Sequence, residues 1–272
     1  MKNLFISTAC FLFTSVGYCG IVFHWSGDNT LTDSVQNRAV SFIGNTAYSE
    51  GVFNSAFNLS GQTFLSTPDS VDLNFTNSDF SVSLWINHNS INFSKDRVGY
   101  IGHNEGSGNR DKWVLWLDGW GNHINPDGSS GSTELGLRFH VEGPSIPPVD
   151  NAVYQWTPNL HTWYHLTAVR DSNNYKLYID GSLVENRNSS YFPNDPATNL
   201  TIGLTEETNY FDGLVDEVFL FNHALTSAEV GLLYNTNSLI AVPEPSETAL
   251  VVSMVLGGFV YINKRRQHLP RN

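Results

Sequence analysis

The chain has 272 residues, 40% of them hydrophobic and 15% charged, and a formal net charge of −12. Of its 14 basic and 26 acidic side chains, 9 and 24 lie in residues 21–240, so this segment carries −15. Nucleic-acid binding needs the opposite sign of charge, so the composition excludes that class. The length suits one domain with a sizeable core.

Residues 1–20 predict a secretory signal peptide. Lys2 precedes an apolar stretch at 4–16, and small or polar residues lead to Gly20. Both cysteines, Cys10 and Cys19, lie in this segment, and neither has a lipoprotein context. We therefore expect an exported mature domain without a disulfide bond, stabilised by a packed core.

Residues 21–240 predict an all-β domain. Strand patterns occur at 80–86, 112–117, 135–141, 162–170, 175–179, 183–184, 200–203 and 214–221. Asp180 and Gly181 signal a tight hairpin turn. The single predicted helix begins with a capping box from Thr226 to Glu229 and ends at Tyr234. This pattern predicts an antiparallel two-sheet jelly-roll sandwich with one short late helix.

The C-terminal residues 241–272 predict a linker and a membrane-directed signal. A Pro-flanked acidic spacer precedes an apolar helix at about 248–263, and a basic tail follows. The apolar core at 249–262 would be about 21 Å long against roughly 30 Å of hydrocarbon, which favours a transient signal over a permanent anchor. A plain C-terminal membrane anchor is the alternative. The defining residues are Pro243, Glu244, Pro245, Arg265 and Arg266.

This three-part order resembles the PEP-CTERM sorting signal of Gram-negative bacteria. The resemblance implies transient membrane insertion and an exosortase as the processing partner. It also implies a final location at the cell surface or in an extracellular biofilm matrix of exopolysaccharide.

Five motifs in the domain resemble those of laminin-G-like, concanavalin A-like lectin/glucanase domains. They are FSVSLWI (80–86), WYHLTAV (163–169), LYIDG (177–181), FDGLVDEV (211–218) and NHALTSAE (222–229). The resemblance is collinear over residues 22–236 and implies a concanavalin A-like jelly roll. It is weakest in the N-terminal third, where NLSG (58–61) replaces Phe-Asp-Gly and so lacks an acidic ligand. This fold carries lectins, glucanases, adhesion modules and spacers, so function depends on the sites.

An enzyme is not expected. The glucanases of this fold carry a Glu-x-Asp-x-x-Glu strand, which places two carboxylates on one face, and the chain lacks that motif. Asp216 and Glu217 are adjacent on a predicted strand and would point to opposite faces. No Ser-His-Asp order or zinc motif occurs. A glycoside hydrolase on the same fold remains the least favoured alternative.

The resemblance also implies a structural Ca²⁺, with Asp216 at the position of the family's ligand carboxylate. Calcium takes six to eight oxygens, which carboxylates and carbonyls can supply. The alternative is that Asp216 orders neighbouring backbone without a metal. His165 lies inside a predicted strand and is interpreted as a sheet histidine.

A ligand surface is predicted around the loop at 121–132. Trp113 and Trp116 differ by three along a strand, so they face opposite ways and at least one should be core. The predicted ligand-binding residues are Asp118, Trp120, Asn122 and His123. Aromatic faces stack on sugar rings, while amides and carboxylates bind hydroxyls.

The sequence therefore predicts an exported non-catalytic binding module that recognises carbohydrate or a surface protein. A passive structural matrix protein is the alternative.

Overall fold

The computed structural model describes residues 20–91, 97–119, 135–143 and 151–237. Contacts gather Gly20–Ser238 into one compact unit. The predicted signal peptide and sorting signal lie outside the described residues. Within the described ranges, no helix is long and apolar enough to cross a membrane.

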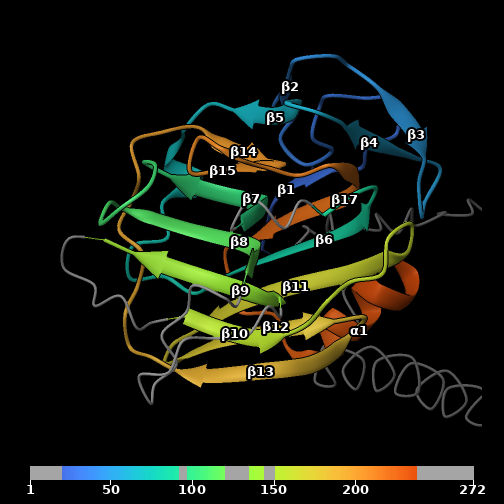
Figure 1. The fold of residues 1–272 in the computed structure, drawn as a ribbon. Coiled ribbons are helices and arrows are strands. Elements are labelled where there is room, and N and C mark those ends of the chain that lie inside the picture. The colour runs from blue at the N-terminus through green and yellow to red at the C-terminus, as the bar shows by residue number, and fades with distance from the viewer. Residues whose placement is uncertain (1–19, 92–96, 120–134, 144–150, 238–272) are drawn as a thin grey trace, which may run out of the picture. The chain divides into compact units, whose positions relative to one another are not determined.

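Two antiparallel sheets lie one over the other as a jelly roll, which confirms the predicted fold class (Figure 1). The eight-stranded sheet contains β1 (Ile21–Trp25), β3 (Tyr48–Glu50), β4 (Ser55–Leu59), β6 (Phe80–His88), β11 (Trp163–Asp171), β12 (Asn174–Ile179), β13 (Ser182–Asn188) and β17 (Gly213–Phe221). The seven-stranded sheet contains β2 (Ser41–Ile43), β5 (Phe64–Thr67), β7 (Arg97–Asn104), β8 (Lys112–Gly119), β9 (Leu135–Glu142), β10 (Asn151–Gln155) and β14 (Leu200–Ile202). A 3₁₀ turn, η1 (Val71–Leu73), follows β5.

Strand order places non-consecutive segments side by side. The eight-stranded sheet runs β13-β12-β11-β6-β17-β4-β3, with β1 also paired to β17. The seven-stranded sheet runs β10-β9-β8-β7-β14-β5-β2. The candidate site described below is built on the neighbours β7, β8 and β9 (Figure 1).

The core lies between the sheets and follows the period-2 pattern of the strands. Phe80, Val82 and Leu84 of β6 are fully buried in it, as are Leu115 and Phe139 from the facing sheet. The rings of Phe80 and Phe139 meet edge to face at 5.7 Å. The described residues contain no cysteine, so this apolar burial is the main stabilising contribution there.

The helix α1 (Ser227–Thr236) covers the outer face of the eight-stranded sheet, where Tyr234 stacks on Trp85 at 5.6 Å. Its capping box is confirmed, because Thr226 Oγ1 accepts a hydrogen bond from the Glu229 backbone N–H and Glu229 accepts one from the Thr226 N–H. Beneath it, His165 Nε2 lies 2.8 Å from Ser83 Oγ. His165 is thus a buried sheet histidine, as predicted.

The hairpin turn between β12 and β13 is also as predicted. Asp180 and Gly181 have φ of 49° and 75°, the left-handed values that a type I′ turn requires. The second strand is longer than the predicted 183–184, because its pairing with β12 continues to Asn188.

The predicted strand at 200–203 is wrong at its end. β14 stops at Ile202, and Gly203 has φ of 83° and lies against the Leu59 side chain, where a Cβ would collide. The chain turns there into a small hairpin of β15 (Leu204–Thr205) and β16 (Asn209–Tyr210). The sequence pattern did not predict β7, because two glycines and a bulge between Gly99 and Ile101 interrupt the alternation of apolar and polar residues in this strand.

Candidate functional site

The outer face of the seven-stranded sheet carries a set of mostly buried polar and aromatic side chains. β8 and β9 pair so that Lys112 lies opposite Glu142 and Trp116 opposite Arg138. The intervening residues, such as Leu115, point into the core. We call this set the charged face; its members are Arg97, Lys112, Trp116, Asp118, Arg138, His140, Glu142 and Glu206.

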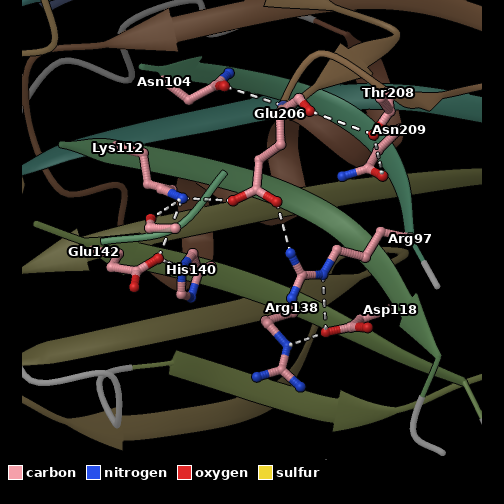
Figure 2. Close-up of polar contacts among 11 residues, drawn as sticks. Arg97, Asn104, Lys112, Asp118, Arg138, His140, Glu142, Glu206, Thr208 and Asn209 are labelled. Atoms are coloured by element: carbon pink, nitrogen blue, oxygen red, sulfur yellow. Dashed lines mark hydrogen bonds and ion pairs between the residues drawn. The ribbon is translucent and has the colours of Figure 1, made fainter. Parts of the chain in front are cut away.

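The hairpin of β15 and β16 packs on the β7 end of this face. It fits because β7 has glycine there: a Cβ on Gly99 would lie 2.6 Å from the Thr205 backbone nitrogen, and one on Gly102 would lie 3.2 Å from the Thr205 methyl group. The hairpin turn puts Glu206 in left-handed backbone, with φ of 48°. Asn104 Oδ1 accepts from the Glu206 N–H at 3.1 Å, which fixes the residue over the sheet (Figure 2).

Glu206 bridges two cations. Its Oε1 lies 2.5 Å from Lys112 Nζ and its Oε2 lies 2.6 Å from Arg97 Nη1 (Figure 2). Lys112 is fully buried, and its ammonium also contacts Glu142 at 3.2 Å. His140 Nε2 lies 3.1 Å from the same Glu142 carboxylate. The hydrogen bond from His140 and the Lys112 charge lower the pKa of Glu142.

The other end of the charged face contains two guanidinium groups and one carboxylate. Asp118 Oδ2 lies 3.1 Å from Arg138 Nε and 3.9 Å from Arg97 Nε (Figure 2). The Arg138 side chain is only 2% exposed. Burial lowers the pKa of Arg138 to about 10, the Asp118 charge opposes this, and the Arg97 charge adds to it. Arg138 therefore stays cationic at neutral pH.

Trp116 lies between these two ends, within a stack of planar groups. The His140 ring stacks on its indole at 5.0 Å, and the Arg97 guanidinium lies 4.5 Å from the indole centroid. Because His140 and Arg97 come from the strands on either side of β8, they cover both faces of the ring. Sugar stacking on Trp116 is thereby blocked, and the indole N–H at its edge is the group left for recognition.

Four buried nitrogen donors on the charged face form no hydrogen bond among the described residues: Arg97 Nε, Trp116 Nε1, Arg138 Nε and Arg138 Nη2. The two Nε atoms lie within ion-pair distance of Asp118, which leaves Trp116 Nε1 and Arg138 Nη2 without an acceptor there. A buried donor without an acceptor costs about 1–3 kcal/mol, so such donors point to bound water or a ligand. Oxygen acceptors such as sugar hydroxyls would satisfy both.

The predicted ligand-binding residues fall partly on this face. Asp118 lies one residue before the end of β8, and its buried carboxylate forms the ion pair with Arg138. Trp120, Asn122 and His123 lie outside the described residues. Of the two strand tryptophans, Trp113 is core and Trp116 is on the opposite face, as their spacing predicts.

Asp216, the predicted calcium ligand, lies buried in the eight-stranded sheet. Its Oδ2 accepts hydrogen bonds from the backbone N–H groups of Val52 (2.8 Å) and Phe53 (3.1 Å), so it orders the turn between β3 and β4. Its Oδ1 has no hydrogen-bond partner in the described part of the chain. Burial, with a smaller contribution from the charge of Glu217, raises the pKa of Asp216 to about 7.

The calcium assignment remains a prediction. Asp216 offers one free carboxylate oxygen, whereas calcium takes six to eight ligands. Among the described residues, the group of three candidate metal ligands is elsewhere: Asp69, His103 and Asp195. There His103 Nε2 lies 2.7 Å from the Thr198 carbonyl oxygen, which its N–H reaches as a donor.

A Ser-His-Glu contact occurs on the eight-stranded sheet, and sequence order did not reveal it. Ser34 Oγ lies 2.8 Å from His24 Nδ1, and His24 Nε2 contacts Glu217. The backbone N–H groups of residues 35, 36 and 38 all donate to Asp33, so this turn offers none of those donors to a reaction oxyanion. The contact therefore holds the turn that contains Ser34 against β17.

The prediction that Asp216 and Glu217 point to opposite faces is wrong, because the core side chains that flank the pair are Val215 and Val218 and both acids lie on the other face. A register shift between Asp216 and Phe219 makes a bulge, and Glu217 has φ of 49°. Asp216 accepts from the Val52 and Phe53 N–H groups whereas Glu217 contacts His24, so the two carboxylates bind different segments. On the charged face, the lowered pKa of Glu142 is the opposite of what a general acid needs.

Sequence reasoning missed most of the charged face: Arg97, Lys112, Arg138, His140, Glu142 and Glu206. The signal was present in β8 and β9, where charged residues alternate with core residues on two strands that later pair. Arg97 and Glu206 carried no such signal, because their strands are broken by glycines and a left-handed turn.

Comparisons with known proteins agree with this architecture. Solved structures similar to the chain include domain 4 of AbnA, a GH43 extracellular arabinanase from Geobacillus stearothermophilus in complex with arabinotriose (23% identity, 79% of this chain and 98% of that chain, TM-score 0.56). The binding domain of Paraclostridial Mosquitocidal Protein 1 (16% identity, 80% and 52%, TM-score 0.63) is also similar. So is the binding domain of Botulinum neurotoxin DC in complex with rat synaptotagmin II (15%, 81% and 52%, TM-score 0.60).

The chain thus spans nearly all of the arabinanase domain and about half of each toxin domain. At these identities the likeness shows the fold alone. No curated protein sequence matches the chain. The sequence profile of Laminin_G_3, described as concanavalin A-like lectin/glucanases superfamily, matches residues 59–231. Since that match covers more than half of the sequence and the jelly roll agrees with it, the chain belongs to the Laminin_G_3 family.

Proposed function

We propose that this protein is an exported, non-catalytic carbohydrate-binding domain, with the charged face as its binding surface. The observation that carries the proposal is a pair of buried donors, Trp116 Nε1 and Arg138 Nη2, for which the structure as described supplies no acceptor. Sugar hydroxyls would accept from both donors and donate to the neighbouring carboxylates, which is the usual polar pattern of a ligand site. In the free protein, ordered water would take their place.

The similar structures support a binding role. The arabinanase domain, which the chain spans almost completely, was solved with an arabinose trisaccharide. The toxin neighbours are binding domains, one of them in complex with a protein, rat synaptotagmin II. Carbohydrate is the first choice here, and a surface protein is the second.

The predicted loop residues extend this proposal. Trp120, Asn122 and His123 follow β8 directly in the sequence, at the strand end that carries Asp118. An exposed indole at position 120 would supply the stacking surface that Trp116 lacks.

Export and processing belong to the same proposal. The N-terminal signal peptide would direct secretion, and the Pro-Glu-Pro segment with its basic tail would be cut by an exosortase-type enzyme. The domain would then act at the cell surface or in the exopolysaccharide matrix. Mass spectrometry of the mature C-terminus tests this directly, and recovery of an uncut 272-residue chain from the matrix would contradict it.

The test of binding is a glycan array probed with the unit Gly20–Ser238, which contains both sheets and the whole described core. The informative variant is Trp116→Phe, which keeps a stacked ring but removes the N–H donor. Trp85→Phe is the matched control, because it removes a buried indole N–H on the other sheet. We expect a glycan signal that Trp116→Phe weakens and Trp85→Phe leaves unchanged.

A passive structural matrix protein is the second candidate. It is favoured by the charge balance of the charged face, where Arg97, Lys112 and Arg138 face Asp118, Glu142 and Glu206. Such a balanced network can simply hold the hairpin on the sheet. Silence across the array, with all variants folded, would select this candidate.

A further inference from the structure

The charged face already binds one carboxylate, that of Glu206. This group is not part of the sheet: it reaches the face from the hairpin of β15 and β16 and inserts between Lys112 Nζ (2.5 Å) and Arg97 Nη1 (2.6 Å). Figure 2 shows the two carboxylate oxygens directed at these two cations. The Glu206 contact thus shows that this face can bind a planar carboxylate between two basic side chains.

A second cation on the same face, Arg138, has no equivalent partner among residues 20–91, 97–119, 135–143 and 151–237. Arg138 meets one carboxylate, Asp118, through its Nε, and that same Asp118 oxygen is also the one nearest Arg97 Nε. The terminal Nη2 of Arg138 is buried and has no acceptor among the described residues. Two guanidinium groups therefore share one carboxylate oxygen, while Arg138 Nη2 has no acceptor in the described part of the chain.

The neighbouring Trp116 defines the rest of the subsite. Its ring is held by His140 and Arg97, and its N–H is a second donor for which the described residues offer no acceptor. Trp116 is also the residue paired directly with Arg138. A guanidinium edge beside a single N–H suits a carboxylate next to a hydroxyl. A uronic acid carries both groups on one sugar ring.

We propose that the charged face selects acidic saccharides, with the carboxylate of a uronic acid residue bound by Arg138 and a hydroxyl of the same sugar bound by the Trp116 N–H. This inference rests on the proposed carbohydrate-binding function and names its ligand class. The ligand carboxylate takes the position beside Arg138 that Glu206 takes beside Arg97.

The charge of the domain gives the proposal a distinctive salt dependence. Residues 21–240 carry −15, so the long-range field repels a polyanion, and salt screens that repulsion. The contact at Arg138 is buried and is screened less. Affinity for an acidic oligosaccharide should therefore hold or rise between about 20 and 150 mM salt, whereas attraction to an exposed basic patch falls over that range.

The experiment compares ligands that differ only in charge. Calorimetric titration of Gly20–Ser238 would use oligomers of polygalacturonate and of alginate, each beside its esterified, uncharged form. We expect at least one acid to bind tenfold or more tightly than its ester. Arg138→Gln should abolish this preference, Arg138→Lys should keep part of it, and Arg187→Gln, an exposed change on β13, should leave it intact.

The test still works if the single variant Arg138→Gln fails to fold. Asp118→Asn/Arg138→Gln removes both charges together, so no buried carboxylate is left alone, and the ligand comparison needs no variant. Equal binding of acid and ester overturns the inference but leaves carbohydrate binding in place. Absence of binding to any glycan overturns both. A preference for acid that survives Arg138→Gln, or that falls steeply with salt, also overturns the inference.

Discussion

Replacing Asp216 by Asn tests a buried carboxyl group whose pKa is strongly raised. In the folded protein Asp216 accepts two backbone hydrogen bonds through Oδ2, while the buried Oδ1 has no hydrogen-bond partner within the described residues. Burial raises its pKa from 3.8 to about 7. Asn reproduces the shape and the neutrality of the protonated acid and keeps an oxygen for the Val52 and Phe53 N–H groups.

The size of the effect follows from that shift. A raised pKa means that the folded state binds the proton more tightly, so its contribution to stability is complete below pH 3.8 and is lost as the pH rises through 7. Three units at about 1.4 kcal/mol each give a ceiling of about 4 kcal/mol. Asp216→Asn should match the wild type at pH 4 and exceed it at pH 8 by up to this amount.

The assay is urea unfolding of Gly20–Ser238 and its variant at pH 4, 6 and 8. Histidine titrations cancel in the difference, because both proteins share them. Asp171→Asn is the control, since it removes a partly exposed carboxylate paired with Lys176 and should change stability little. If Asp216→Asn lowers stability equally at all three values of pH, Asp216 is ionised when folded and the reasoning fails.

The same variant tests the calcium prediction. If Asp216 binds calcium, then adding calcium after chelator treatment should raise the stability of the wild type at pH 8 and leave the variant unchanged. No response of the wild type to calcium would refute the assignment.

Three further predictions concern the packing of the β15–β16 hairpin on β7, the buried His165 and the predicted binding residue Trp120. Gly99→Ala should lower stability by about 1–3 kcal/mol, because its Cβ would meet the Thr205 backbone. Gly231→Ala in α1, with nothing within 4 Å, should raise it by roughly 0.5–1 kcal/mol; thermal melts of both compare them directly, and equal effects would refute the packing argument. Burial lowers the pKa of His165 to about 3, so its contribution to stability is complete above pH 6.5 and is lost as the pH falls toward 3. In that window the free energy of unfolding of His165→Gln should change less steeply with pH than that of the wild type, by up to about 1.4 kcal/mol per pH unit. An unchanged slope would contradict burial as the cause. Trp120→Ala should reduce glycan binding on the array without changing the melting temperature, and full retention of binding would remove the loop from the site.

The sequence alone determined the layered β fold. The alternation at 80–86 predicted a strand, and the Asp180-Gly181 turn predicted the pairing of β12 with β13; the structure confirms both. The capping box at Thr226 predicted the start of the helix in the same way. These features are local, because backbone geometry and side-chain direction repeat every two residues in a strand and every turn in a helix.

Only the tertiary structure decided the charged face. Glu206 is 94 positions from Lys112 and 109 from Arg97, and the three meet because Gly203 turns the chain and glycines in β7 let the hairpin approach. Likewise His24 meets Glu217 across 193 positions, through pairing of β1 with β17. Electrostatic partners are chosen by strand order and by bulges, which depend on the packing of the whole sandwich and leave no period in the sequence.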